Sequence, residues 1–504
     1  MSGSAMPPTI APTQSIITSL ARAIASSGIL SISMLEMKRA MSGRKRGLID
    51  RLVAITVTGA TIFIKNCLMV KAFIRFDEKG NQWSPIKDGR TRRKYMSKII
   101  PHLGGSRRRF IRNAGATVAL ASTGLSMPHI AQAAGTVKIG LIHPATGWAA
   151  YPAAQLRYGA QMAIADINAA GGIKSMGGAQ IEALLGDSQT KPEIGAAEVE
   201  KMNEAGVHAL QGCYQSAVGL AASAAAAKYN IPFSVDVGVS DKLVGRGLPN
   251  VFRMADGYGR IARDASAYLG EINAAAGSPA KTVVIVHEES EFGTGTAKLL
   301  TPALAERGLT VVDTIKHANP TRNFDNIALR IKSAKPDIIM PINYPGEYVL
   351  LAKTLRQQRV DFMTSFSVLG GGFNFKFIDD MPEIAENMID VNHWYDPRSA
   401  SGQAMRKRTE ADGKYFTFEV YCAYMSIMFL ADGFERAGST DKDAVNAALA
   451  TSTLEVDFMP YDKTEMVNGQ NMGSRAVAIQ AQNGDCQVVA PSAYASAKAV
   501  FPRA

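Results

Sequence analysis

The sequence has few of the residues that make catalytic or metal centres. It contains 4 cysteines and 7 histidines in 504 residues, with no C-x-x-C pair and no regular histidine spacing. Zinc sites and disulfide frameworks need such spacings, so neither is predicted. The P-loop, nucleophile-elbow and H-E-x-x-H patterns are also absent. We therefore expect no catalytic residues, no metal, no cofactor and no enzymatic activity, with an enzyme kept as the alternative class.

A basic charge is also missing from most of the chain. The whole sequence carries 55 Lys+Arg and 44 Asp+Glu, a formal net charge of +11. Residues 1–135 hold 21 of the basic and 5 of the acidic residues, and taking these from the totals leaves 34 basic and 39 acidic residues from 136 onward. The larger part of the chain thus lacks the electrostatic footprint of a nucleic-acid binder, and no nucleic-acid partner is expected.

Long apolar runs are scarce as well. The stretch 52–70 is interrupted by Lys65 and is close to the minimum length for a bilayer helix, so a membrane anchor there is only the competing interpretation. The overall composition, with 47% hydrophobic residues, is that of a globular protein large enough for two or three domains. The cysteines beyond the leader, Cys213, Cys422 and Cys486, are expected to be buried thiols, with one disulfide as the alternative.

Residues 96–134 have the three parts of an export signal. SRRRFIR at 106–112 is followed by the weakly apolar run AGATVALASTGLSMPHI and by the small-x-small site A-Q-A. The pattern resembles a bacterial twin-arginine signal peptide, which implies the twin-arginine export machinery, cleavage near Ala133 and a periplasmic mature protein. A basic linker between two domains is the alternative interpretation.

The signal raises the question of the residues before it, because an export signal acts only near an N-terminus. Met96 stands immediately before SKIIPHLGGSRRRF, so we predict that Met96 is the true start. Residues 1–95 are then an upstream extension or a leader without a domain of its own. No cysteine lies at the cleavage region, so the mature protein is expected to be free of a lipid anchor.

From Thr136 onward, strand and helix patterns alternate. TVKIGLI is typical of a buried strand, and the helical pattern at 152–172 stops at Gly171 and Gly172. The alternation continues to a pivot near VFRMADGYGR and then restarts with KTVVIVH. Alternation of this kind favours parallel sheets covered by helices on both faces, and two runs of it predict two α/β lobes.

Motifs along this part of the chain resemble one known family. They are VKIGLIHPATG, RYGAQMAIADINAAGGI, GDSQTKPEIGAAEVEKM, ESEFGTGTA, KPDIIMPINYPGEYVLLAKTLRQQ and YMSIMFLADGFERAGSTDKDAVNAAL. Together, from about 137 to the C-terminus, they resemble the leucine/isoleucine/valine-binding family of solute-binding proteins of ABC importers. The resemblance implies a two-lobed type I periplasmic-binding fold, three crossing strands, a ligand cleft at the hinge, and an ABC permease and ATPase complex as partners. On this basis lobe 1 comprises 136–254 and about 385–455, and lobe 2 comprises about 255–384 and 456–504.

The resemblance also assigns ligand contacts. Ser216 takes the place of the family's carboxylate-holding serine, and a hydroxyl at a helix N-terminus independently suits an anion; a simple N-cap is the alternative. In the second contact loop Val239 replaces a threonine, and Ser240 is the candidate substitute for its hydrogen bond. Val237 belongs to the same contact loop. The resemblance also places Trp148, Tyr151 and Tyr344 at the ligand, with packing at a lobe edge as the alternative, and Tyr214 is a further candidate contact as an aromatic that could stack on a ring.

One position departs from the family pattern. In FSVLGGGF the chain has Leu369 where the family places a glutamate that pairs with the ligand's ammonium. A buried ammonium without a counter-charge is costly, so either Glu347 or Asp236 substitutes or the ligand has no ammonium. The expected solute is therefore an amino acid, an amide or a related small carboxylate. An aromatic or aliphatic acid, which the aromatic contacts could hold, and a sensor on the same fold are the alternatives.

Overall fold

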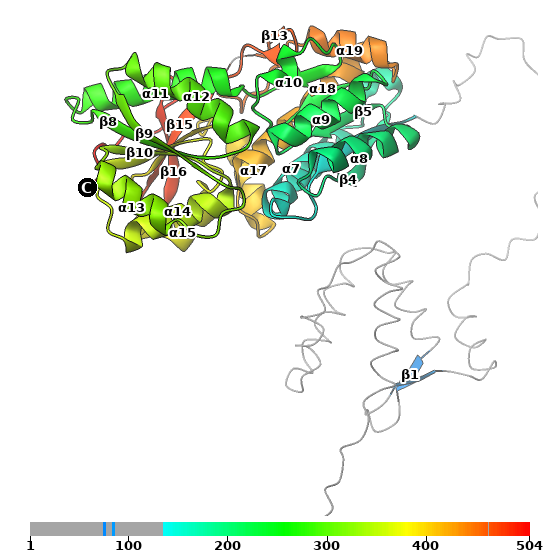
Figure 1. Ribbon diagram of the computed structural model, residues 1–504. Helices are drawn as coiled ribbons and strands as arrows, with labels where there is room; N and C mark the ends of the chain where they lie inside the picture. The colour runs from blue at the N-terminus through cyan, green and yellow to red at the C-terminus, as the bar shows by residue number, and fades with distance from the viewer. Residues whose placement is uncertain (1–73, 77–82, 86–134, 462, 504) are drawn as a thin grey trace, which may run out of the picture. The chain divides into compact units, whose positions relative to one another are not determined.

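The computed structural model describes residues 74–76, 83–85, 135–461 and 463–503 (Figure 1). The chain divides into two compact units, residues 1–126 and 127–504. In the first unit the structure describes one antiparallel pair, β1 (Ile74–Phe76) and β2 (Trp83–Pro85). The predicted signal peptide and its cleavage site, and all of the predicted extension except this strand pair, lie outside the described residues.

Residues 127–504 form two lobes, each built on a 7-stranded sheet. The first sheet has the order β13-β14-β7-β6-β5-β3-β4. All of its neighbours pair in parallel except β13 and β14. Its strands are β3 (Thr136–His143), β4 (Gln180–Asp187), β5 (Ala209–Gly212), β6 (Phe233–Val235), β7 (Val251–Arg253), β13 (Met466–Val467) and β14 (Gln470–Asn471).

The second sheet has the order β16-β15-β12-β11-β10-β8-β9. Its strands run parallel except for β15, which is antiparallel to both β12 and β16. They are β8 (Thr282–Glu288), β9 (Thr310–His317), β10 (Ile338–Ile342), β11 (Thr364–Val368), β12 (Ile389–Asn392), β15 (Val477–Gln482) and β16 (Asp485–Ala490).

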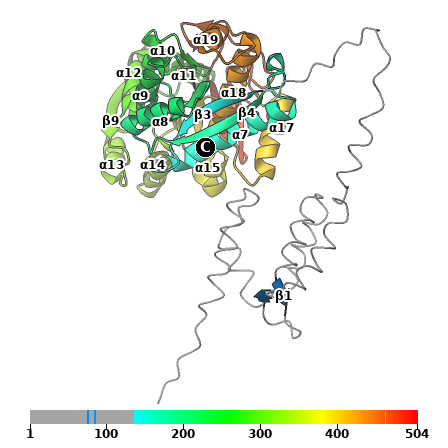
Figure 2. The same ribbon diagram turned by 90° about the vertical axis from the view of Figure 1, so that its right-hand side faces the viewer.

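Helices surround both sheets, as Figures 1 and 2 show. They are α7 (Ala150–Ala169), α8 (Pro192–Glu204), α9 (Ser216–Ala227), α10 (Lys242–Gly245), α11 (Tyr258–Ala275), α12 (Glu291–Ala305), α13 (Asp325–Ala334), α14 (Pro345–Gln357), α15 (Phe375–Asp380), α16 (Pro382–Ala385), α17 (Ala400–Ala411), α18 (Phe418–Ala437) and α19 (Lys442–Ala450), with the single 3-10 turn η1 (Lys174–Met176).

Successive strand residues belong to different hydrophobic cores. On β3, Leu141 packs in one core and Ile142 in another, and on β8 the same holds for Ile285 and Val286. Because side chains alternate along a strand, this division means that each sheet is buried on both faces. The predicted α/β class, two lobes of mainly parallel strands covered by helices, is confirmed.

The chain passes between the lobes three times, after β7, after β12 and between β14 and β15. These crossings are tied to one another. The Asn471 side chain donates a hydrogen bond to the carbonyl of Met254, and the Ser474 hydroxyl lies 2.6 Å from a carboxyl oxygen of Asp256. Residues of all three crossings line one small internal cavity of about 20 Å³. The crossings therefore form one connected band at the hinge.

Two short strands lie in a different lobe from the one their range predicted. Range 385–455 was expected in lobe 1, but β12 pairs with β11 in the second sheet. Range 456–504 was expected in lobe 2, but β14 pairs with β7 in the first sheet. The sheet that a short strand joins is decided by the strands it pairs with, and the local residue pattern does not contain that information.

Helices α7 and α18 approach each other unusually closely in the first lobe. A Cβ atom added to Gly159 on α7 would lie 2.3 Å from the carbonyl oxygen of Val420 on α18. Only glycine allows this approach, because the obstructing atom belongs to the backbone and cannot rotate away. The contact fixes the first turn of α18 against α7. Among the described residues no helix has the length and apolar character needed to cross a membrane.

Candidate ligand-binding site

A small buried cavity of about 30 Å³ lies where the loops of the two lobes meet, and we call it the inner cavity. Its walls come mainly from residues that follow the carboxyl ends of parallel strands, where open α/β sheets place their ligands. The lining residues are Tyr214, Ser216, Val237, Val239, Phe292, Asn343, Tyr344, Leu369, Gly371 and Phe418. Six of these were predicted as ligand contacts: Ser216, Tyr214, Val237, Val239, Tyr344 and Leu369.

Ser216 is the first residue of α9 and is almost fully buried. The cap position belongs to Gln215, and no side chain caps the helix. The Ser216 Oγ accepts a hydrogen bond from the backbone N–H of Ser240 at 3.2 Å, and it donates to no acceptor among the described residues. Its own O–H is therefore available, beside the unpaired N–H groups of the first helical turn. This combination can hold a carboxylate.

The second predicted contact loop supplies apolar walls only. Val237 and Val239 line the inner cavity, whereas the Ser240 Oγ donates a hydrogen bond to Glu291 at 2.9 Å. Ser240 does not line the cavity and does not replace the missing threonine hydroxyl. Its local role is to link the first lobe to the start of α12 in the second, and its backbone N–H holds Ser216 in place.

An aromatic cluster joins the two lobes at the cavity. Tyr344, which follows β10 in the second lobe, has its ring centre 4.5 Å from Trp148 and 5.7 Å from Tyr214, both of the first lobe. Phe292 packs against the same ring at 5.2 Å. Such tilted aromatic contacts are favourable beyond the area they bury, so they stabilise the closed arrangement of the lobes.

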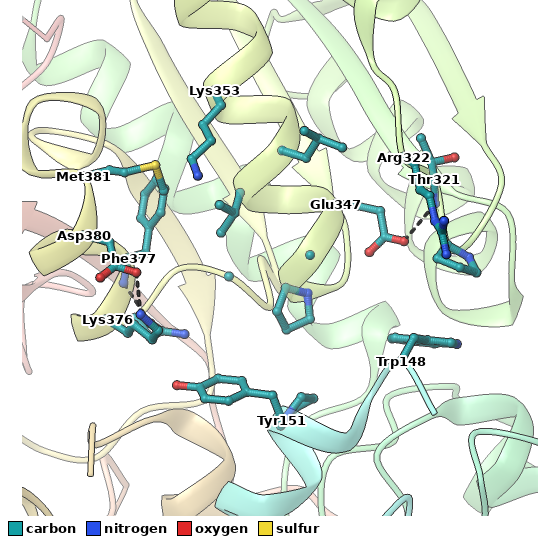
Figure 3. Close-up of a pocket in the computed structure, with 18 residues that line it drawn as sticks. Trp148, Tyr151, Thr321, Arg322, Glu347, Lys353, Lys376, Phe377, Asp380 and Met381 are labelled. Carbon is teal, nitrogen blue, oxygen red and sulfur yellow. Dashed lines mark hydrogen bonds and ion pairs between the residues drawn. The ribbon is translucent and has the colours of Figure 1, made fainter. Parts of the chain in front are cut away.

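A larger space lies on the other side of Trp148, and we call it the outer chamber. Its volume is about 660 Å³, within the range of small-molecule pockets. Figure 3 shows Trp148 and Tyr151 on the first lobe, facing Glu347 and Lys353 across the chamber. The predicted contacts Trp148, Tyr151 and Glu347 thus line the outer chamber rather than the inner cavity.

The charged groups of the outer chamber are partly paired. A carboxyl oxygen of Glu347 accepts a hydrogen bond from the backbone N–H of Thr321 at 3.1 Å, and burial raises the pKa of this carboxyl. Lys376 forms an ion pair with Asp380 at 2.5 Å. Lys353 is exposed at the wall of the chamber. The walls of the chamber therefore carry both a carboxyl group, on Glu347, and an amino group, on Lys353.

Asp236, the other acid considered as a counter-charge, is already paired. One of its carboxyl oxygens lies 2.6 Å from His143 Nε2 and the other accepts a hydrogen bond from the backbone N–H of Val237. Both side chains are fully buried. Asp236 is thus part of the structural core of the first lobe and is not free to receive a ligand cation.

The structure reveals a buried acid that the sequence reasoning missed. Glu419, in the first turn of α18, is 2% exposed, and its Oε2 has no hydrogen-bond partner in the part of the chain that the structure describes. Burial raises its pKa to about 7, against the smaller opposing effect of the Thr417 hydroxyl. Its neighbour Phe418 lines the inner cavity. The local sequence sign of a buried acid here was its place near the start of a mainly apolar helix.

Other chemistry is not assembled nearby. The thiols of Cys213, Cys422 and Cys486 are buried and unbonded, and burial raises the pKa of each. Within the described ranges no group of three or more His, Cys, Asp or Glu side chains could hold a metal ion. The arrangement places the N-terminus of α9, with the Ser216 hydroxyl, beside apolar and aromatic walls.

Comparison with known sequences identifies relatives along this part of the chain. Residues 136–486 match the family model described as "Periplasmic binding protein". The Leu/Ile/Val-binding protein BraC3 of Rhizobium johnstonii is 28% identical over 321 residues, which cover 62% of this chain and 83% of the relative. Leu/Ile/Val-binding protein homolog 7 of Brucella suis is 24% identical over 395 residues, covering 74% of this chain and 96% of the relative.

Solved structures share the fold at lower identity. The branched-chain amino acid transporter substrate-binding protein LivJ from Streptococcus pneumoniae, in complex with isoleucine, is 22% identical with a TM-score of 0.62 and covers 73% of this chain and 100% of that chain. An ABC transporter solute-binding protein from R. palustris, in complex with benzoate, is 19% identical with a TM-score of 0.63 and covers 72% and 98%. The two-lobed architecture is thus common to proteins with different ligands.

Proposed function

The chain belongs to the periplasmic binding protein family, and we propose that it is the solute-binding component of an ABC importer. Members of this family are binding proteins rather than enzymes, and they bind small solutes and work with ABC permeases. The solute we propose is an amino acid, an amide or a related small carboxylate. It is captured by closure of the two lobes and delivered to the permease with its ATPase.

The observation that carries this proposal is the inner cavity, where a free hydroxyl at a helix N-terminus faces apolar and aromatic walls. The Ser216 hydroxyl and the first N–H groups of α9 suit a carboxylate, and Val237, Val239 and Phe418 suit an apolar body. A cavity of about 30 Å³ holds one or two water molecules, so a solute of amino-acid size enters only when the lobes separate.

Two classes of acid fit this description. The names of the curated relatives favour a branched-chain amino acid. An aromatic or aliphatic acid is the second candidate, favoured by the interlobe aromatic cluster around Tyr344 and by Leu369 at the position expected for an acid. In both cases the carboxylate of the solute binds at Ser216. A substitution of this residue therefore tests the proposal whichever class of acid is the true solute.

The test is a Ser216→Ala variant examined by titration calorimetry. The probes are leucine, phenylalanine, their amides, 4-methylpentanoate, 3-phenylpropanoate and benzoate. We expect wild-type binding of at least one acid, and Ser216→Ala should weaken it by about 1 to 3 kcal/mol because a buried carboxylate loses a donor. Ser223→Ala is the matched control, since this buried serine of the same helix donates to the Gly219 carbonyl. Unchanged affinity in Ser216→Ala would contradict the site.

We also propose that the protein reaches the periplasm through the twin-arginine route and that Met96 is its true start. Support comes from the Ser106–Arg112 segment, the apolar run after it and the cleavage pattern near Ala133. Mass spectrometry of the protein from its own host tests the start. A peptide from residues 1–95 would contradict it.

A further inference from the structure

We propose that Glu419 is the acid that pairs with the amino group of the solute, so that the protein prefers amino acids over the same acids without the amino group. This proposal rests on the proposed function, because the partner of Glu419 is an amino acid whose carboxylate is held at Ser216. It assigns the missing counter-charge to the first lobe and to a residue that the sequence did not single out.

The first argument is that, of four buried acids near the site, Glu419 is the one whose fully buried carboxyl oxygen has no hydrogen-bond partner among the described residues. Asp236 is paired with His143. Glu288 accepts hydrogen bonds from the backbone N–H groups of Ser290 and Gly293 and from the Ser290 hydroxyl, and Glu347 accepts one from Thr321. The Oε2 of Glu419 has no partner among the described residues.

The second argument is the position of the carboxyl group. Phe418, the residue before Glu419, lines the inner cavity, and so does Tyr214. After burial itself, the charge of Glu419 is the largest influence that raises the pKa of the Tyr214 hydroxyl. The charge of Glu419 is likewise, after burial, the largest influence that raises the pKa of Tyr151, which lines the outer chamber. The carboxyl group of Glu419 therefore lies near one residue of the inner cavity and one residue of the outer chamber, although Glu419 does not itself line either space.

The third argument is that the surroundings offer no counter-charge. The titratable groups on which the charge of Glu419 acts are Tyr151 on α7, Tyr214 after β5 and Cys422 on α18 itself. Burial raises the pKa of each, so all three are neutral near pH 7. The buried imidazole of His143 is occupied by Asp236. A buried carboxylate without a cation is costly, and an ammonium group brought by the solute removes that cost.

The fourth argument is that the backbone that carries Glu419 is held in place. Its helical turn packs against α7, where Gly159 meets the backbone of Val420, the residue after Glu419. This turn therefore need not shift when the solute arrives. Fixing the backbone before binding lowers the cost of rearrangement.

The proposal predicts a coupling between binding and pH. Free Glu419, with a pKa of about 7, is mostly protonated at pH 6 and mostly ionised at pH 8, and the ionised fraction rises about tenfold between them. An amino acid binds the ionised form, so its affinity should rise by about tenfold over this range, with release of nearly one proton per complex at pH 6. A plain acid prefers the protonated form, so its affinity should fall.

The experiment compares leucine with 4-methylpentanoate, which is leucine without its amino group. Calorimetry at pH 6 and pH 8, in two buffers of different ionisation enthalpy, measures affinity and proton release for the wild type and for Glu419→Gln. Glu435→Gln is the matched control, because Glu435 lies on the same helix 16 residues further on, about 24 Å away. Thermal unfolding of each variant reports whether the fold is retained.

We expect Glu419→Gln to lower leucine affinity at pH 8 by at least about 30-fold, to abolish proton release and to leave 4-methylpentanoate affinity undiminished, with a gain of up to about tenfold at pH 8 because the ionised carboxylate is removed. Leucine binding without proton exchange, together with a neutral Glu419→Gln, overturns the role of Glu419 while carboxylate capture stands. Equal losses for both probes with a lowered unfolding temperature show a structural role and also overturn it. If the wild type binds neither these probes nor phenylalanine and 3-phenylpropanoate, the proposed function fails as well.

Discussion

Replacement of Glu419 by glutamine should stabilise the protein, and more so as the pH rises. Burial raises the pKa of this carboxyl from its ordinary 4.5 to about 7, so the folded state binds the proton more tightly than the unfolded state. The sign follows from linkage: the wild type has its full stability below pH 4.5 and loses free energy of unfolding as the pH rises towards 7. Glutamine has no charge to bury and escapes this loss.

The magnitude follows from the same two values. A pKa raised from 4.5 to about 7 corresponds to about 3 kcal/mol at alkaline pH, and at pH 5 only about 1 kcal/mol of it has been lost. The free energy of unfolding of Glu419→Gln should therefore exceed that of the wild type by about 2 kcal/mol more at pH 8 than at pH 5. All other titrating groups are shared by the two proteins and cancel in the comparison.

Urea unfolding at the two pH values, without added solute, measures this difference. Glu435→Gln serves as the control, because Glu435 lies at the far end of α18 and accepts hydrogen bonds from the backbone N–H groups of Lys174 and Ser175. Its effect on stability should be similar at pH 5 and pH 8. Parallel pH profiles for wild type and Glu419→Gln would refute the argument that Glu419 is an uncompensated buried acid.

Two further predictions concern the first lobe and the leader. Gly159→Ala should lower the free energy of unfolding by about 1 to 3 kcal/mol, because its Cβ would lie 2.3 Å from a backbone oxygen of α18. Gly245→Ala, which has open space around the added Cβ, is the control and should not be destabilising. Equal unfolding temperatures for both variants would contradict the close approach. Replacing Arg107 and Arg108 together by lysine should block export in a fractionation assay, while Arg109→Lys should not, since a receptor reads the pair and not the bulk charge. Periplasmic recovery of the double variant would show that another signal is used.

The fold could be predicted because its signal is local. Apolar strands such as 136–142 alternate at short intervals with helical patterns such as 152–172, and this alternation indicates parallel sheets covered on both faces. The partition between lobes was predicted less well. Strands β12 and β14 are so short that their sheet is decided by pairing, β12 with β11 and the distant β15, and β14 with the distant β7.

The candidate site was predicted where a residue type and its place after a strand were enough. Ser216, Val239 and Tyr344 meet at one cavity for that reason. The prediction that Asp236 could serve as a counter-charge was wrong, because His143, on a neighbouring part of the same lobe, already occupies it. Glu419 was missed because its burial depends on how α18 packs against α7, which no local pattern in the sequence records.

The band of three linked crossings has a mechanical consequence. One connection between two bodies would leave them free to twist, slide and bend. Here two of the three connections are hydrogen-bonded to each other and all three line one cavity, so they favour bending over twisting and sliding, like a strip hinge. A change in the separation of Ser216 and Tyr344 would then appear as a change in the orientation of the two outer surfaces.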